Sequence, residues 1–132
     1  MSANTALELE DVVFRYQEKG RRNILDHTSL TIPAGTLTVL MGGSGCGKST
    51  LGRTILRLIE PTSGQILFDG TDLCTIKGKA IDLRRQRMGI VFQQFTLFNN
   101  MDVMHNLTAA PVRIKGMSQS DAQEKALELL AK

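Results

Sequence analysis

The sequence predicts an α/β fold, because short apolar segments of strand character alternate with segments of helical periodicity. Residues 6–16 and 27–32 alternate apolar and polar side chains in part, as strands with one exposed face do. The nearly continuous apolar run 36–41 is typical of a strand that is covered on both faces. Residues 48–59 follow a glycine-rich turn and place leucine and isoleucine side chains at helical spacing.

Composition excludes several classes of protein. With 132 residues, of which 42% are hydrophobic and 22% charged, the chain has the length and balance of one soluble domain. No apolar run approaches the roughly 20 residues that a membrane span needs. The net charge of +3, the single tyrosine and the lack of tryptophan do not favour a nucleic-acid partner. Cys46 and Cys74 lack the spacing of a disulfide framework or a metal site, which indicates a reduced, cytoplasmic protein.

Turn residues separate the elements of the first half. Residues 17–23 are polar, contain a glycine and predict a turn after the first strand. Pro61 ends the first helix, because proline cannot continue a helix and restricts the residue before it. Residues 65–68 predict a further strand, and Asp69 and Gly70 predict the turn that follows it.

The second half is predicted to be mostly helical. Residues 82–86 predict a short helix, and residues 89–92 predict a buried strand. A weaker helical pattern covers residues 102–114, and Pro111 is expected to mark its end. A cluster of basic side chains is expected to be solvated surface: Arg84, Arg85 and Arg87.

Residues 118–132 carry the clearest helical pattern of the second half. Ser118, followed three residues later by Asp121, resembles a capping box at the start of this helix. Its expected apolar face consists of Ala122, Ala126, Leu129 and Leu130.

The motif with chemical content is the segment 42–49, which fits G-x-x-x-x-G-K-[ST] between a predicted strand and a predicted helix. A phosphate chain needs several backbone N–H groups that converge on it, and glycine lets the loop curl tightly enough to supply them. The helix that follows points its free N–H groups and its positive dipole end at the same oxygens. A glycine-rich turn before an ordinary helix is the plain alternative. The segment therefore predicts a nucleotide site formed by Gly42, Gly43, Ser44, Gly45, Cys46, Gly47, Lys48, Ser49 and Thr50.

Individual side chains have separate roles in this prediction. Lys48 supplies a positive charge for the β- and γ-phosphates, and the Ser49 hydroxyl is placed to bind Mg²⁺. Cys46 is interpreted as a small residue that fills a variable position of the loop. Gln93 follows a predicted buried strand and precedes a loop, where its amide can reach both a metal ion and water. An ordinary surface amide is the alternative for Gln93.

Three segments follow one another along the chain: GSGCGKST, PTSGQILFDGTDL and MGIVFQQFTLFNNMDVMHNL. In these three segments the chain resembles the ATP-binding subunit of ABC transporters. The segment APVRIKGMSQSDAQEKALELL is similar to the branch that takes up polar amino acids, although relatives that export lipoproteins or move other small solutes share most of these motifs. The resemblance covers essentially all of the chain but only the first half of the family's domain.

The resemblance implies a role for several residues. Tyr16 corresponds to the aromatic residue that stacks on adenine, with a half-buried strand tyrosine as the alternative. Lys48 and Gln93 would act in catalysis on ATP, and Ser49 and Gln93 would bind Mg²⁺. Gln93 would also couple the site to the membrane subunit, with Gln94 and residues 95–101 in or beside that surface.

The resemblance also implies an architecture and a set of partners. Residues 1–101 would be the N-terminal part of the nucleotide-binding core, with antiparallel strands and part of a parallel sheet. Residues 102–132 would begin a helical subdomain. The parent protein would be a peripheral ATPase at the cytoplasmic face of the membrane. It would pair with a second copy of itself, with permease subunits near Gln93 and, indirectly, with a solute-binding protein.

Some features of the family are absent from the sequence. It has no LSGGQ-like signature and no strand ending in Asp-Glu, and His27 and His105 lie too early to be the family's switch histidine. We therefore expect a truncated chain that binds nucleotide weakly, hydrolyses it near the background rate and is poorly stable alone. The rival functions are a small P-loop nucleotide kinase, for which no lid is visible, and a non-transport member of the same family.

Overall fold

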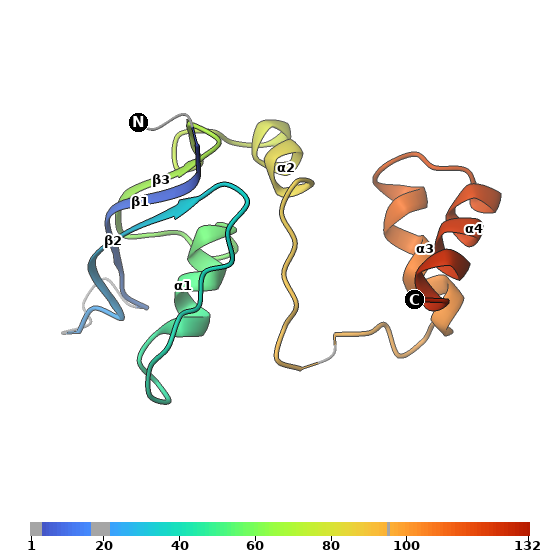
Figure 1. Ribbon diagram of the computed structural model, residues 1–132, viewed down its shortest axis with the longest axis horizontal. Coiled ribbons are helices and arrows are strands. Elements are labelled where there is room, and N and C mark those ends of the chain that lie inside the picture. The colour runs from blue at the N-terminus through green and yellow to red at the C-terminus, as the bar shows by residue number, and fades with distance from the viewer. Residues whose placement is uncertain (1–3, 17–21, 95) are drawn as a thin grey trace. The chain divides into compact units, whose positions relative to one another are not determined.

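The computed structural model describes residues 4–16, 22–94 and 96–132, which form two compact units, Met1–Gly89 (unit 1) and Ile90–Lys132 (unit 2). Figure 1 shows the elements of each unit. Unit 1 contains β1 (Thr5–Phe14), β2 (Leu25–Pro33), α1 (Lys48–Ile55), β3 (Ser63–Phe68), β4 (Thr71–Asp72) and α2 (Lys79–Arg85). Unit 2 contains α3 (Val103–Arg113) and α4 (Gln119–Leu130). Most of the predicted turn 17–23, together with Phe95, lies outside the described residues.

Unit 1 is built on a four-stranded sheet with the order β2-β1-β3-β4, in which every pairing is antiparallel. The central strand β1 places Leu9 opposite Leu30 of β2 and opposite Ile66 of β3. The three strands predicted at 6–16, 27–32 and 65–68 are thus confirmed, with shifted ends. The turn at Asp69 and Gly70 is confirmed as well, and it leads into β4, which the sequence analysis missed because it has only two residues.

A bulge interrupts β1 at Asp11, where the pairing with both neighbouring strands changes register. Asp11 has a positive φ of 52°, and its N–H donates a 3.0 Å hydrogen bond to the hydroxyl of Ser29. Gly64 of β3 faces the bulge with a φ of +98°. A Cβ at Gly64 would lie 2.5 Å from the carbonyl oxygen of Asp11, so only glycine fits there.

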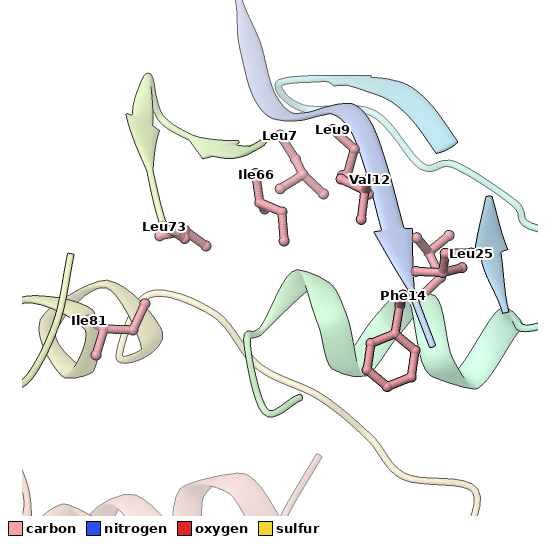
Figure 2. Close-up of a cluster of buried hydrophobic side chains, with 9 residues drawn as sticks. Leu7, Leu9, Val12, Phe14, Leu25, Ile66, Leu73 and Ile81 are labelled. Carbon is pink, nitrogen blue, oxygen red and sulfur yellow. The ribbon is translucent and has the colours of Figure 1, made fainter. Parts of the chain in front are cut away.

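The core of unit 1 lies between the sheet and α1, as Figure 2 shows. Leu9, Val12 and Ile66 are fully buried, and each such side chain contributes about 1.5–3 kcal/mol by leaving water. Helix α1 ends earlier than residue 59, because Arg57 adopts a left-handed conformation with a φ of 52°. The buried cluster comprises Leu7, Leu9, Val12, Phe14, Leu25, Leu51, Ile66, Leu73 and Ile81.

Two predicted strands, 36–41 and 89–92, are wrong, since neither segment forms a strand. Leu37 and Val91 are each 93% exposed instead of being covered on both faces. A strand exists only where a neighbour accepts its backbone hydrogen bonds, and among the described residues no strand pairs with either segment. The described residues therefore contain the antiparallel part of the expected architecture and no parallel pairing.

The prediction that Arg84, Arg85 and Arg87 solvate the surface is wrong for Arg85, which is partly buried, whereas the side chain of Arg87 is exposed as expected. Arg85 donates hydrogen bonds to the carbonyl oxygens of Leu56 at 3.1 Å and of Arg57 at 2.6 Å. Carbonyl groups at the end of a helix such as α1 have no partner within the helix. Arg87 forms a 2.8 Å ion pair with Asp69 and lies over the ring of Phe68. The contacts of Arg85 hold α2, which begins three residues before its predicted start, against the end of α1.

Unit 2 is a pair of packed helices. The Asp102 carboxylate caps α3 by accepting a 2.7 Å hydrogen bond from the N–H of His105, and the predicted cap of α4 is confirmed by a 3.2 Å bond from the N–H of Asp121 to Ser118. Pro111 lies inside α3 instead of at its end. The apolar face predicted for α4 is correct for the buried Ala122 and Ala126 but wrong for two half-exposed residues of its last turn, Leu129 and Leu130.

Candidate nucleotide-binding site

The glycine-rich loop leads directly into α1 and needs glycine at two positions. Gly45 and Gly47 have φ values of +78° and +100°, which are left-handed conformations that other residues rarely adopt. A Cβ at Gly47 would also lie 3.1 Å from the carbonyl oxygen of Ile24, so the end of the loop touches the residue before β2. Helix α1 then begins without a capping side chain and without an acidic residue in its first turn. Its free N–H groups and dipole therefore favour an anion.

Lys48 lies over this loop. Its ammonium group donates hydrogen bonds to the carbonyl oxygens of Gly42 at 2.5 Å and Gly43 at 2.9 Å, and to the Cys46 sulfur at 3.4 Å. The thiol of Cys46 is so near Gly42 that a Cβ there would meet it at 2.6 Å. Apart from the adjacent residues, no atom lies within 4 Å of a Cβ placed on Gly43 or Gly45, so the loop has open space at both positions.

The hydroxyl groups that follow the loop face different surroundings. Ser49 is exposed in the first turn of α1, next to Lys48. Mg²⁺ is bound in proteins by few protein oxygens together with substrate phosphates, and an exposed serine hydroxyl beside a phosphate loop fits this chemistry. No cluster of three or more histidine, cysteine or acidic residues that could hold a metal ion by itself occurs in the described part of the chain.

Thr50 and Tyr16 are brought together by the fold. Thr50 is only 8% exposed, and its hydroxyl oxygen lies 3.4 Å from that of Tyr16, within hydrogen-bond distance. The Tyr16 ring meets the ring of Phe14 edge to face, with centroids 4.9 Å apart and an angle of 82°. Tyr16 is 65% exposed, so it is not a half-buried strand residue, and a face of its ring remains free for stacking. Sequence spacing gave no signal of this contact, since the two residues are 34 positions apart.

Gln93 belongs to unit 2 and lies on an exposed bend, as does Gln94. The phosphate loop, Tyr16 and Ser49 belong to unit 1. The structure thus brings together the unit 1 residues of the predicted site, and a role for Gln93 at Mg²⁺ stays a prediction. Leu97 and Phe98, a few residues after Gln93, expose most of their apolar side chains.

Each of the two histidine side chains contacts an aspartate carboxylate. Nδ1 of His27 is 2.6 Å from the Asp11 carboxylate, whose hydrogen bond and charge raise the pKa of His27 above 6.5. His105 makes the corresponding contact with Asp102 at 2.7 Å. Within the described ranges, no helix combines the length and apolar character that crossing a bilayer requires.

Comparison with known proteins gives a consistent picture. Residues 25–132 match the family described as ABC transporter. The chain is 43% identical over 116 residues to the trimethylamine N-oxide transport system ATP-binding protein TmoW of Pelagibacter ubique, covering 87% of this chain and 34% of that protein. It is 36% identical over 126 residues to the methionine import ATP-binding protein MetN of Staphylococcus saprophyticus, covering 94% of this chain and 36% of that protein. The chain thus spans about a third of the length of these relatives.

Among solved structures, the dimeric post-hydrolysis state of the ATP-binding cassette MJ0796 bound to ADP and Pi superposes with a TM-score of 0.82 at 29% identity, covering 95% of this chain and 56% of that one. The names of the relatives give different solutes, so the polar amino-acid branch is not confirmed. Because the family match extends over most of the chain and the fold agrees, this protein belongs to the ABC transporter family, among its ATP-binding proteins.

Proposed function

We propose that this chain is the nucleotide-binding part of an ATPase subunit that energises the uptake of a small polar solute by an ABC transporter. The geometry of the phosphate loop is the main support. Its open space at Gly43 and Gly45, the uncapped start of α1 and the Lys48 ammonium all belong to the segment 42–49, and all three favour a polyphosphate.

Each residue of the loop has a role in this proposal. Lys48 places its charge against the β- and γ-phosphates, and the Ser49 hydroxyl holds Mg²⁺ from the protein side. When bound, Mg²⁺ supplies charge that neutralises the phosphate oxygens. Tyr16 offers its free ring face to adenine. The backbone cradle is formed by Gly42, Gly43, Ser44, Gly45, Cys46 and Gly47, with Thr50 directly behind it.

Gln93 is the second residue that we place in catalysis, as a ligand of Mg²⁺ that also positions water. In this proposal residues 1–101 form part of the nucleotide-binding core and residues 102–132 begin a helical subdomain. The exposed Leu97 and Phe98 support a docking surface for permease subunits just after Gln93, because large apolar side chains in one exposed segment favour a protein partner. A second copy of the subunit, a solute-binding protein and a position at the cytoplasmic face of the membrane complete the proposal.

The solute is proposed to be a polar amino acid or a molecule of similar size and charge. The names of two relatives support this class, since trimethylamine N-oxide and methionine are both small polar molecules with separated charges. Neither name distinguishes amino acids from other solutes of that class.

Titration of the chain with MgATP in a calorimeter tests the nucleotide site. Lys48→Ala is expected to weaken binding by about tenfold or more, because the loop loses its charge-assisted contact with phosphate. Lys125→Ala is the matched control, since Lys125 lies on the surface of α4 and pairs only with Glu128, at 3.1 Å, among the contacts described for it. Equal affinity in all three proteins would contradict the proposal.

A further inference from the structure

We propose that Thr50 is a positioning residue, which holds the ring of Tyr16 in the orientation that stacks on the nucleotide base. This inference rests on the proposed function and adds to it that one helix binds the phosphates and also orients the ring for the base. The observation behind it is the contact between the two hydroxyl groups, whose oxygens are 3.4 Å apart.

The two partners differ strongly in burial. Thr50 is 8% exposed and sits in the first turn of α1, where the helix fixes its backbone. Tyr16 lies two residues beyond the end of β1, outside the ladder of the sheet, and is 65% exposed. The hydroxyl of a buried helix residue, Thr50, therefore contacts the hydroxyl of Tyr16, whereas most of the Tyr16 side chain stays exposed and available for stacking.

A second contact restricts the same ring. Phe14 is buried in the core shown in Figure 2 and meets the Tyr16 ring edge to face. The carbonyl oxygen of Phe14 accepts a 2.7 Å hydrogen bond from the N–H of Ile24, and Ile24 in turn touches Gly47 of the phosphate loop. The Tyr16 side chain thus contacts Thr50 through its hydroxyl and Phe14 through its ring, and all three residues belong to unit 1.

Such restraint has a consequence for binding. A free tyrosine ring must lose side-chain entropy when it stacks on a base, whereas a ring that is already held loses less. Removal of the Thr50 hydroxyl leaves the edge contact with Phe14 alone to orient the ring. The loss is then expected for ligands that carry a base and not for a bare phosphate chain.

The composition of the chain provides a direct probe. Tyr16 is the only tyrosine and tryptophan is absent, so the intrinsic fluorescence of the whole chain reports this one ring. In the free protein, the fluorescence anisotropy of Tyr16 is expected to fall in Thr50→Val and to be restored in Thr50→Ser, which keeps the hydroxyl. Thr54→Val is the matched control, because the buried Thr54 hydroxyl, one turn along α1, bonds to the carbonyl oxygen of Thr50. It is expected to leave the anisotropy unchanged.

Binding measurements then connect the ring to the ligand. Calorimetric affinities for MgATP and for magnesium tripolyphosphate are compared in each variant. Thr50→Val is expected to weaken ATP binding about 2- to 5-fold more than tripolyphosphate binding, the size of one lost hydrogen bond. Tyr16→Phe, which keeps the ring and removes only its hydroxyl, is expected to give the same selective loss without any change in α1.

Each result has a separate meaning. Unchanged anisotropy in Thr50→Val, or equal losses for ATP and tripolyphosphate, overturns the inference while leaving the nucleotide site intact. Absence of ATP binding by the unaltered chain overturns the proposed function, and the role in base binding with it. A selective loss that Thr50→Ser rescues supports both.

Discussion

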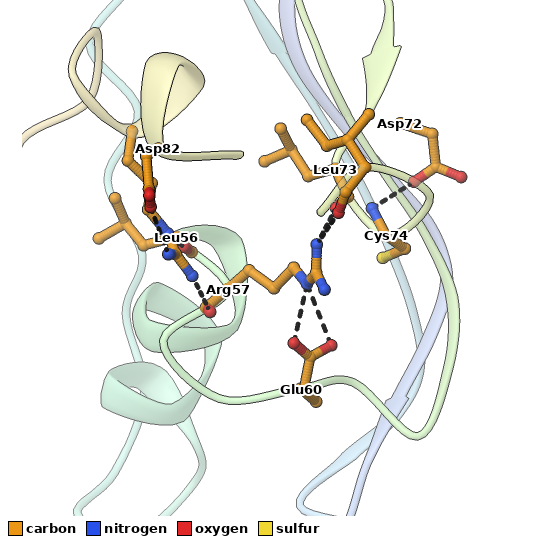
Figure 3. A network of polar contacts seen from close by, with 9 residues as sticks. Leu56, Arg57, Glu60, Asp72, Leu73, Cys74 and Asp82 are labelled. Atoms are coloured by element: carbon orange, nitrogen blue, oxygen red, sulfur yellow. Dashed lines mark hydrogen bonds and ion pairs between the residues drawn. The ribbon is translucent and has the colours of Figure 1, made fainter. Parts of the chain in front are cut away.

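The guanidinium group of Arg57 donates a 2.7 Å hydrogen bond to the carbonyl oxygen of Leu73, across 16 residues of sequence. The same group reaches the carbonyl oxygen of Ile76 and the Glu60 carboxylate. Figure 3 shows the Arg57 side chain between Leu73 and Glu60. Its side chain is only 10% exposed, which is rare for arginine. The end of α1 is therefore fastened to the segment between β4 and α2 by a buried cation.

Replacement of Arg57 is expected to destabilise unit 1. Arg57→Ala leaves the carbonyl groups of Leu73 and Ile76 without this donor, which is expected to cost about 2–3 kcal/mol in the free energy of unfolding. Arg57→Gly loses the same bonds but relieves the left-handed backbone, so its cost is expected to be about 1 kcal/mol smaller. Urea denaturation measures both, and Arg53→Ala, which replaces an exposed arginine of α1, is the control. A loss of unfolding free energy no greater than that of the control would contradict a stabilising role for the hydrogen bonds of Arg57.

Two glycines are expected to respond in opposite directions to alanine. Gly64→Ala forces a Cβ against the backbone of Asp11 at a φ of +98° and is expected to cost about 3 kcal/mol or more. Gly52→Ala lies in α1, where no atom occurs within 4 Å of the new Cβ, and is expected to stabilise by about 0.5–1 kcal/mol. Thermal unfolding measures the stability of both variants. An unchanged melting temperature in Gly64→Ala would mean that the backbone of the bulge at Asp11 moves to make room for the new Cβ.

His27 is expected to titrate above its ordinary pKa of 6.5, because Asp11 accepts a hydrogen bond from its ring and adds its negative charge. NMR titration of the ring C–H signals measures the value. Asp11→Asn is expected to lower the pKa of His27 clearly, and Asp26→Asn to lower it less, since Asp26 is the smaller cause. The stabilisation from this pair is fully present below pH 6.5 and disappears as the pH rises through the raised pKa. Equal pKa values in the unaltered chain and Asp11→Asn would refute the pairing.

The stability of the α3 cap is expected to fall at low pH, when the Asp102 carboxylate becomes protonated. The backbone and ring N–H groups of His105 bond to Asp102 and lower its carboxyl pKa below 3.8. Its contribution to stability is therefore present above pH 3.8 and is lost as the pH falls through the lowered pKa. Asp102→Ala is expected to reduce helical circular dichroism at neutral pH, whereas Asp102→Ser keeps a capping oxygen and most of the signal. Identical spectra for both variants would contradict this role.

The 132-residue chain is expected to hydrolyse ATP at the background rate. Lys48 and Ser49 bind the phosphates and Mg²⁺ in our proposal, but no residue that we assign activates water as a general base. Phosphate release from pure chain and from Lys48→Ala is therefore expected to be equal. Steady turnover that disappears in Lys48→Ala would reverse this expectation.

Local signals in the sequence predicted single elements better than they predicted the whole sheet. The glycine-rich loop is a contiguous pattern, and alternation predicted β1 and β2 because each has one exposed face. A short apolar run followed by a turn signal predicted β3. The apolar character of residues 36–41 and 89–92 is typical of strands that are covered on both faces. A local pattern does not tell whether a neighbouring strand is present to pair with them, and none is found among the described residues. The contacts of Arg57 with Leu73, Arg85 with Leu56 and Tyr16 with Thr50 join residues 16 to 34 positions apart, which no periodicity encodes.

In the free protein, Lys48 already donates hydrogen bonds to the carbonyl oxygens of Gly42 and Gly43. Any affinity measured at this loop is therefore relative to a state in which these bonds are formed. An arriving phosphate does not meet a bare cation, because the chain's own oxygens already occupy it. Binding is then an exchange of one set of acceptors for another, and its free energy is the difference between them. A substitution that weakens the bonds of Lys48 with Gly42 and Gly43 would raise the affinity for nucleotide without adding a contact to the nucleotide.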